Sequence, residues 1–188
     1  MESYDAVILA GGRGSRLGGV DKPALEVGDR TLLERVLAAV TGAGRVVVAG
    51  PAAPPPAIVV REEPPGAGPV AALAAALPEV TAPVVLVLAA DLPFLTERHC
   101  ARLRSALRGD AAVAVDTGGH DQYLLAAWRT PALRRRLDGL PGYGGLPVRR
   151  LYQGADLDRV ALEAAGTRPP PWFDCDTAED LRTARENA

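Results

Sequence analysis

The chain has 188 residues, 48% of them hydrophobic and 23% charged, and a net charge of −2 at pH 7. This length and composition predict a single domain over 1–188, and the near-neutral charge argues against a nucleic-acid partner. No apolar run approaches the roughly 18 residues that a membrane span needs. With no leader-like segment and only Cys100 and Cys175 as cysteines, we expect a reduced, cytoplasmic setting.

In the first half of the chain, short apolar runs alternate with segments of helical spacing. The spacing predicts strands at 5–10, 45–50, 57–62 and 83–91, and helices at 31–40 and 68–77. Thr31 and Glu34 are spaced as a capping box at the start of the first helix. The run 83–91 is apolar on both faces, as expected of a central parallel strand.

The second half continues the alternation less regularly. Its helices are expected at 96–107, 130–137 and 177–187, and its strands at 110–116 and within 118–128. Strands separated by helices of this length predict βαβ units. The fold class is therefore α/β, in three layers, with a mostly parallel sheet and helices on both faces.

A glycine-rich segment, LAGGRGSRLGGVDKPAL, follows the first predicted strand at 9–25. Backbone N–H groups in such a loop can converge on a phosphate. The dinucleotide-binding pattern fails here at Leu17, and the P-loop pattern fails because Val20 and Asp21 stand at its lysine and hydroxyl positions. Lys22, the only lysine in the chain, supplies a compact ammonium inside this segment.

The segment does fit LAGG followed by R-[LM]-G and K-x-x-L, and it resembles the signature loop of nucleotidyltransferases with a glycosyltransferase-A-like, Rossmann-like fold. Among these, it is most similar to the molybdenum cofactor guanylyltransferase family. Three further stretches carry the resemblance across nearly the whole chain: GAGPVAAL at 66–73, VLVLAADLPFL at 85–95 and FDCDTAEDL at 173–181.

The resemblance implies transfer of GMP from GTP to the phosphate of molybdopterin or of the molybdenum cofactor, with release of pyrophosphate and with Mg²⁺ as cofactor. It also implies transient contact with proteins that insert molybdenum and mature molybdoenzymes. The attacking group would be a phosphate monoester, whose second pKa is about 6, so no side-chain base is required. Catalysis would rest on positioning and electrostatics.

The same resemblance implies the site residues. Catalytic roles fall to Arg16, Lys22 and Asp91, and His120 and Gln122 would contact the acceptor. The nucleotide would be bound by Leu9, Ala10, Gly11, Gly12, Arg13, Gly14, Lys22, Glu63, Gly68 and Asp91. In the acidic pair Glu62–Glu63, Glu63 is favoured as the counterpart of the family's acidic residue.

Asp91 is the expected Mg²⁺ ligand, and Asp176 stands where the family often has asparagine. An aspartate there would be a hard anionic oxygen ligand, or it would simply precede the last helix, and the sequence leaves both open. Two other functions also remain open. One is a related transferase that uses CTP, which LAGG disfavours, or another phosphate acceptor. The other is a nucleotide-binding regulatory module without turnover.

Overall fold

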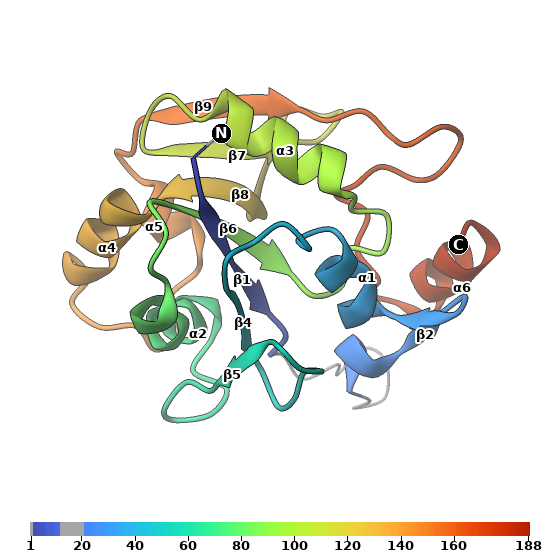
Figure 1. Ribbon diagram of the computed structural model, residues 1–188, viewed down its shortest axis with the longest axis horizontal. Coiled ribbons are helices and arrows are strands. Elements are labelled where there is room, and N and C mark those ends of the chain that lie inside the picture. The colour runs from blue at the N-terminus through green and yellow to red at the C-terminus, as the bar shows by residue number, and fades with distance from the viewer. Residues whose placement is uncertain (1, 12–20) are drawn as a thin grey trace.

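The computed structural model describes residues 2–11 and 21–188, and its centre is one seven-stranded sheet (Figure 1). The strand order is β5-β4-β1-β6-β8-β7-β9. The strands are β1 (Tyr4–Leu9), β4 (Val46–Ala49), β5 (Ile58–Val60), β6 (Val84–Ala89), β7 (Ala111–Val115), β8 (Asp121–Arg129) and β9 (Leu157–Ala161). A separate hairpin is formed by β2 (Glu26–Val27) and β3 (Arg30–Thr31).

The sheet is mostly parallel, as the sequence predicts. Strand β8 is antiparallel to both of its neighbours, β6 and β7, while the pairs β5–β4, β4–β1, β1–β6 and β7–β9 are parallel. The segment 83–91 does form the central strand, but β6 is parallel to β1 on one side only. The expectation of a strand with parallel neighbours is therefore half correct, because the chain returns through β8 in the opposite direction.

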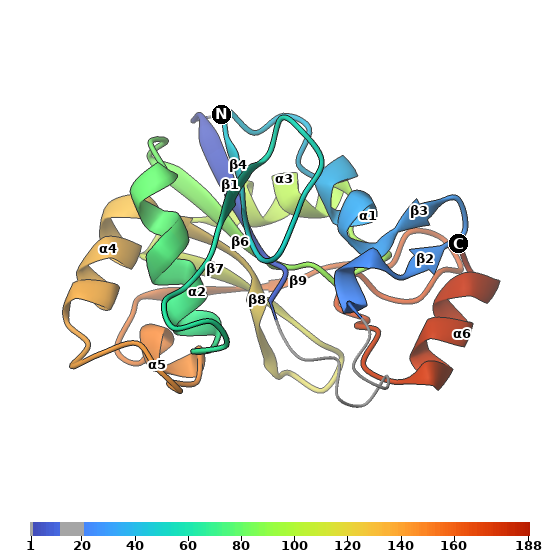
Figure 2. The same ribbon diagram turned by 90° about the horizontal axis from the view of Figure 1, so that it is seen from below.

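Helices cover both faces of this sheet, which confirms the predicted layers (Figure 2). The helices are α1 (Leu32–Ala38), α2 (Pro69–Ala76), α3 (Glu97–Ala106), α4 (Thr130–Asp138), α5 (Arg149–Tyr152) and α6 (Ala178–Glu186), with 3-10 turns η2 (Lys22–Ala24) and η3 (Leu77–Glu79). Helices α1 and α3 pack on one face, and α2, α4 and α5 pack on the other. No helix in the described ranges is long and apolar enough to cross a membrane.

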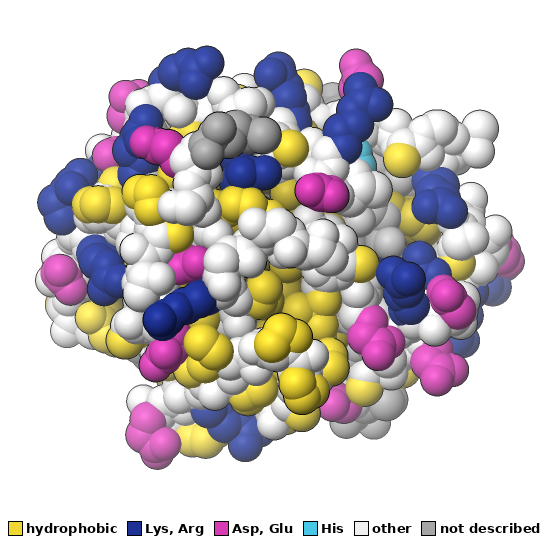
Figure 3. Space-filling view, viewed as in Figure 1, with side chains coloured by type: hydrophobic (Ala, Val, Ile, Leu, Met, Phe, Trp, Pro, Cys, Tyr) yellow, Lys and Arg dark blue, Asp and Glu magenta, His cyan; other side chains and the backbone are white. Residues whose placement is uncertain are grey.

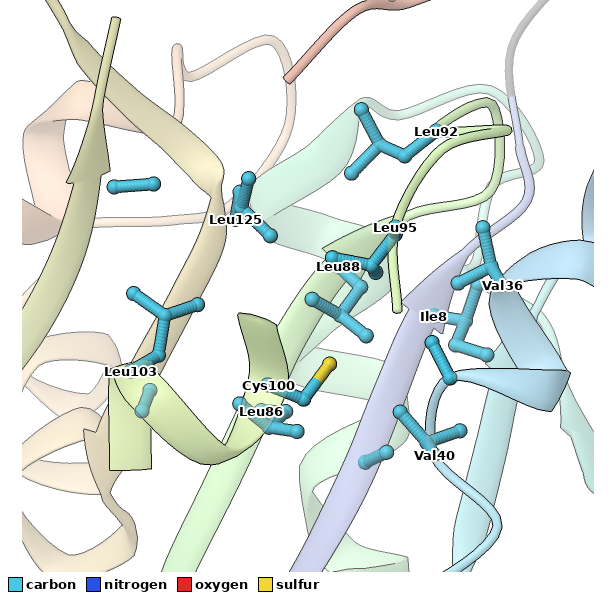
Figure 4. Packing of buried hydrophobic residues seen from close by; sticks show 14 of the residues in the cluster. Ile8, Val36, Val40, Leu86, Leu88, Leu92, Leu95, Cys100, Leu103 and Leu125 are labelled. Atoms are coloured by element: carbon cyan, nitrogen blue, oxygen red, sulfur yellow. The ribbon is translucent and has the colours of Figure 1, made fainter. Parts of the chain in front are cut away.

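Strand β1 explains why the central strands are apolar throughout. Successive side chains of a strand point to opposite faces. Ile8 therefore contacts the cluster under α1 and α3, where Val36 and Leu103 lie (Figure 4), while Val7 joins the cluster under α2 and α4. All four side chains are fully buried. The strand alternates between two cores, so Ala6–Leu9 are all hydrophobic, while the buried Asp5 at its start accepts hydrogen bonds from the backbone of Arg45, Thr81 and Ala82.

Local capping fixes where two helices begin. Glu34 N donates to Thr31 Oγ1 at 3.2 Å, and Thr31 N donates to Glu34 Oε2 at 2.8 Å, so the predicted capping box at α1 is confirmed. Thr177 and Asp180 make the same reciprocal bonds at α6, at 3.1 and 2.7 Å. Each box satisfies N–H groups that would otherwise lack partners.

The C-terminal helix packs on the β2–β3 hairpin, and both views place α6 beside β2 (Figures 1 and 2). A third core cluster joins these parts, with Val27, Leu32, Phe94, Cys175, Leu181 and Ala184 as its buried members. This packing returns the end of the chain to the segment that follows β1. It thereby places residues 173–176 next to the carboxyl ends of the central strands.

The surface carries charges of both signs. On the face that Figure 1 presents, Lys and Arg side chains are interspersed with Asp and Glu side chains, while hydrophobic side chains gather near its centre (Figure 3). The mixture agrees with the net charge of −2. The residues that the structure describes on this face form no continuous basic tract of the kind that binds a nucleic-acid backbone.

Candidate active site

A cavity of about 750 Å³ opens at the carboxyl ends of β1, β4, β5 and β6. In α/β sheets this edge is where ligands bind. The residues that line it are Leu9, Ala10, Gly11, Asp21, Lys22, Pro23, Gly50, Pro51, Arg61, Glu62, Pro65, Gly66, Gly68, Pro69, Ala72, Ala89, Ala90, Asp91, Leu124 and Asp176. The cavity wall thus includes parts of the glycine-rich segment and of the stretch 66–73. It also includes Asp91 and Asp176 from the stretches 85–95 and 173–181, which we call the two acidic motifs.

Two glycines allow this wall to be built from backbone. Gly68 precedes α2 with φ of +101°, a conformation that side chains disfavour, and it turns the start of that helix toward the cavity. A Cβ on Gly50 would lie 2.8 Å from Ala10 Cβ, so the segments after β4 and β1 can approach only because Gly50 has no side chain. The N–H of Gly50 itself donates to Val60 O at 3.1 Å, so Gly50 serves the close approach of the two segments.

Lys22 connects the two acidic motifs. It is the first residue of η2, and its Nζ donates to Asp91 Oδ2 and, at 2.6 Å, to Asp176 Oδ1. The side chains of Lys22 and Asp91 are 15% and 19% exposed, whereas that of Asp176 is 47% exposed. Asp91 follows β6, where Ala90 N donates to Leu9 O at 3.1 Å and holds the strand end against β1.

Asp176 reaches the site through packing of the last segment. Phe173 packs edge-on against Phe94, with 5.7 Å between the ring centroids. Cys175 is fully buried in the cluster with Phe94. Its two neighbours, Asp174 and Asp176, are consequently directed outward from that cluster, toward Asp91. The motifs DLPF and FDCD are therefore joined by their aromatic rings as well as through Lys22.

Three carboxylates gather at this point. Asp91, Asp174 and Asp176 each offer an oxygen within 4.8 Å of the others. Burial and the negative charges of Asp176 and Asp91 raise the pKa of Asp174, although Lys22 opposes the shift. Burial alone would lower the pKa of Lys22, but the carboxylates of Asp91 and Asp176 outweigh it and the pKa is raised. Such hard oxygen donors suit Mg²⁺ or Mn²⁺, so the residues fit a divalent cation.

The two side chains of the acidic pair after β5 lie differently relative to the cavity. The sequence favoured Glu63 at the nucleotide, but the structure turns Glu62 toward the cavity and leaves Glu63 exposed. Glu62 is 8% exposed, and its Oε1 accepts a hydrogen bond from Gly66 N at 2.8 Å. Neighbouring side chains in an extended segment point to opposite sides, so only one of the two can face the site.

Of the two predicted acceptor residues, His120 lies on the turn between β7 and β8, and Gln122 lies at the start of β8. Asp116 Oδ1 accepts from His120 N at 2.9 Å, and Asp116 Oδ2 accepts from Gln122 Nε2 at 3.1 Å. The His120 side chain is 79% exposed. Among the described residues that line the cavity, β8 contributes Leu124 rather than either of these. Their role stays a prediction.

The structure brings together most of the other predicted residues. Leu9, Ala10, Gly11, Lys22, Gly68, Asp91 and Asp176 all border the one cavity. The predicted residues Gly12, Arg13, Gly14 and Arg16 lie outside the described residues. Sequence reasoning missed Arg61 as a wall residue and Asp174 as a member of the carboxylate group, although the D-x-D spacing of Asp174 and Asp176 was a usable signal.

Comparison with known proteins identifies relatives of this chain. The family described as MobA-like NTP transferase domain matches residues 6–164. The chain is 35% identical to molybdenum cofactor guanylyltransferase from Acidiphilium cryptum, over 95% of this chain and 92% of that protein. It is 31% identical to the protein of the same name from Bradyrhizobium sp., over 97% and 92% of the two chains.

Solved structures show the same architecture. The chain superposes on 2-C-methyl-D-erythritol 4-phosphate cytidylyltransferase from Thermus thermophilus with a TM-score of 0.73 and 27% identity, covering 99% and 98% of the two chains. With molybdopterin-guanine dinucleotide biosynthesis protein A from Archaeoglobus fulgidus, the TM-score is 0.74 at 20% identity, covering 97% of each, which shows the shared fold. The predicted resemblance and fold are confirmed: this chain belongs to the family of MobA-like NTP transferase domains.

Proposed function

We propose that this nucleotidyltransferase moves GMP from GTP to the phosphate of molybdopterin or of the molybdenum cofactor, the activity named in its guanylyltransferase relatives. The observation that carries the proposal is the arrangement of Lys22, Asp91 and Asp176 in one cavity with the glycine-rich segment after β1. A triphosphate needs both cationic and metal-binding groups near backbone donors, and this edge supplies all three.

In this proposal the nucleotide lies along the segment Leu9–Gly11 and against the start of α2 at Gly68. The N-terminus of α2 directs N–H groups and a positive dipole end toward the phosphates. Lys22 contributes its ammonium to the same anion. Arg16 is proposed as a second phosphate-neutralising cation on the strength of the sequence motif.

Asp91 and Asp176, with Asp174 beside them, would hold the divalent cation, proposed to be Mg²⁺. When bound, such an ion neutralises charge on the phosphate oxygens and so favours attack by another anion. The chain's part is to fix the ligand oxygens through the Phe94–Phe173 contact and the strand end at Asp91.

The reaction forms one P–O bond and breaks another. An oxygen of the acceptor's phosphate attacks the α-phosphorus of GTP, and the bond from this phosphorus to the oxygen bridging to the β-phosphate breaks. The bond electrons leave with pyrophosphate, where Lys22 stabilises the added charge. The attacking phosphate is largely dianionic near neutral pH, so the chain need not remove a proton. Its work is positioning and electrostatics.

A second candidate function has its own support. The chain is 42% identical to the 2-C-methyl-D-erythritol 4-phosphate cytidylyltransferase of Thermus thermophilus over 112 residues, which are 58% of this chain and 53% of that protein. Cytidylyl transfer to a polyol phosphate is therefore the alternative. The relatives matched over nearly their full length favour the guanylyl reaction.

The test pairs each nucleotide with each acceptor. GTP or CTP is incubated with Mg²⁺ and either molybdopterin or 2-C-methyl-D-erythritol 4-phosphate, and pyrophosphate release is followed. We expect release that requires both GTP and molybdopterin. Release from CTP with the polyol phosphate would instead support the alternative, and the absence of release from every pair would contradict both. Contact with molybdenum-insertion and maturation proteins is a further part of the proposal, testable by pull-down.

A further inference from the structure

The ammonium of Lys22 lies within the carboxylate group that is proposed to bind the divalent cation. Its Nζ donates to one oxygen of Asp91 and to one of Asp176. Oxygens of these two side chains and of Asp174 lie within 4.8 Å of one another. An ammonium and a divalent cation held by the same oxygens would therefore compete for one space, and each would repel the other.

The surroundings make this competition strong. Lys22 and Asp91 are 15% and 19% exposed, so water and salt screen their interaction less than they screen a surface pair. Three neighbouring carboxylates repel one another, and a partly buried charge without a partner is costly. In the nucleotide-free chain the ammonium offsets that repulsion.

The ammonium of Lys22 could also pair with a polyphosphate bound in the same cavity. Its backbone begins η2, which lies in the cavity wall together with Gly11 and Gly68. Its flexible four-carbon stem lets the ammonium move without a shift of the backbone. A polyphosphate in the cavity would attract the ammonium of Lys22. The carboxylates of Asp91 and Asp176 would attract it less, because a divalent cation would take its place beside them.

We propose that Lys22 is the counter-ion of this acidic group in the nucleotide-free chain, and that it keeps the divalent cation out until a triphosphate draws the ammonium away. Metal and nucleotide would then enter together, because each favours the same position of Lys22. The role of the triphosphate rests on the proposed function. The competition between Lys22 and the cation rests on the contacts alone.

The test measures Mn²⁺ binding without nucleotide, by the loss of the free-ion EPR signal. The neutral variants Lys22→Met and Lys22→Gln should bind Mn²⁺ about 5- to 150-fold more tightly than the unaltered chain, the usual range for two coupled binding events. Lys22→Arg keeps the charge and should bind as weakly as the unaltered chain. Arg61→Met removes a cation from the same cavity wall, and its Mn²⁺ affinity should change little.

Equal or weaker Mn²⁺ binding by both neutral variants would overturn the proposal, because it would mean that Lys22 only supports the structure. A gain of the same size in Arg61→Met would also overturn it, since the effect would then be one of net charge. Circular dichroism verifies that each variant is folded. The assay contains neither GTP nor acceptor, so its result stands apart from the success or failure of the GMP-transfer assay.

Discussion

Truncation of Phe173 tests whether the aromatic contact positions the carboxylates that are proposed to bind the divalent cation. Phe173 packs on Phe94, and complete loss of a buried phenylalanine costs about 3–5 kcal/mol. Phe173 is only partly buried, so Phe173→Ala should lower the free energy of unfolding by about 2 kcal/mol, including the 0.5–1.5 kcal/mol typical of a ring pair. The loss is a fraction of the roughly 5–15 kcal/mol that holds a domain together, so the variant should stay folded.

Phe173→Ala should lower kcat/KM by more than its loss of unfolding free energy alone would suggest. Asp174 and Asp176 flank the anchored Cys175, and a displacement of about 1 Å in a positioned group can lower a rate about 100-fold. Leu137→Ala is the matched control, because Leu137 is 2% exposed in the cluster on the opposite face of the sheet. Urea unfolding and kcat/KM are measured on both variants. A Phe173→Ala enzyme with unaltered kcat/KM would refute the positioning role.

Three further predictions follow from the site and the core. Lys22→Ala and Asp91→Ala should each lower kcat about 100- to 1000-fold in the pyrophosphate assay while circular dichroism is unchanged, and full turnover by either would remove it from the mechanism. Glu62→Gln should raise the KM for nucleotide whereas Glu63→Gln should not; the reverse order would restore the assignment made from sequence. Burial lowers the pKa of His99, although the hydrogen bond between His99 and the Glu163 carbonyl opposes this shift. The neutral imidazole therefore contributes its full stabilisation above the ordinary pKa of about 6.5, and this stabilisation is lost as the pH falls through the lowered pKa. Urea unfolding at several pH values should show this loss in the unaltered chain and not in His99→Gln, and identical profiles would contradict it.

Features set by local chemistry were predictable from the sequence. The capping boxes at Thr31 and Thr177 depend on residues three positions apart, and the apolar run of β6 reflects cores on both faces. The place of Asp91 was predictable too, because parallel strands present their carboxyl ends at one edge. These elements agree with the structure closely because neighbouring residues decide them.

Features set by distant contacts were not predictable in the same way. Strands β2 and β3 have two residues each, too few to show a period, and they form where α6 packs. The choice between Glu62 and Glu63 depends on how the loop to Gly66 folds back. Lys22 and Asp176 are 154 positions apart, and only the family resemblance suggested that they share a site. The acceptor residues and the cytoplasmic setting stay predictions.

The most direct measurement is the identity of the product when all nucleotides compete. GTP, CTP, ATP and UTP are supplied together in equal amounts with molybdopterin and Mg²⁺, and the dinucleotide product is weighed by mass spectrometry. The account predicts the guanine dinucleotide as the main product, and its loss when EDTA removes the divalent cation. A cytosine dinucleotide as the main product, or the same guanine product in EDTA, would contradict it.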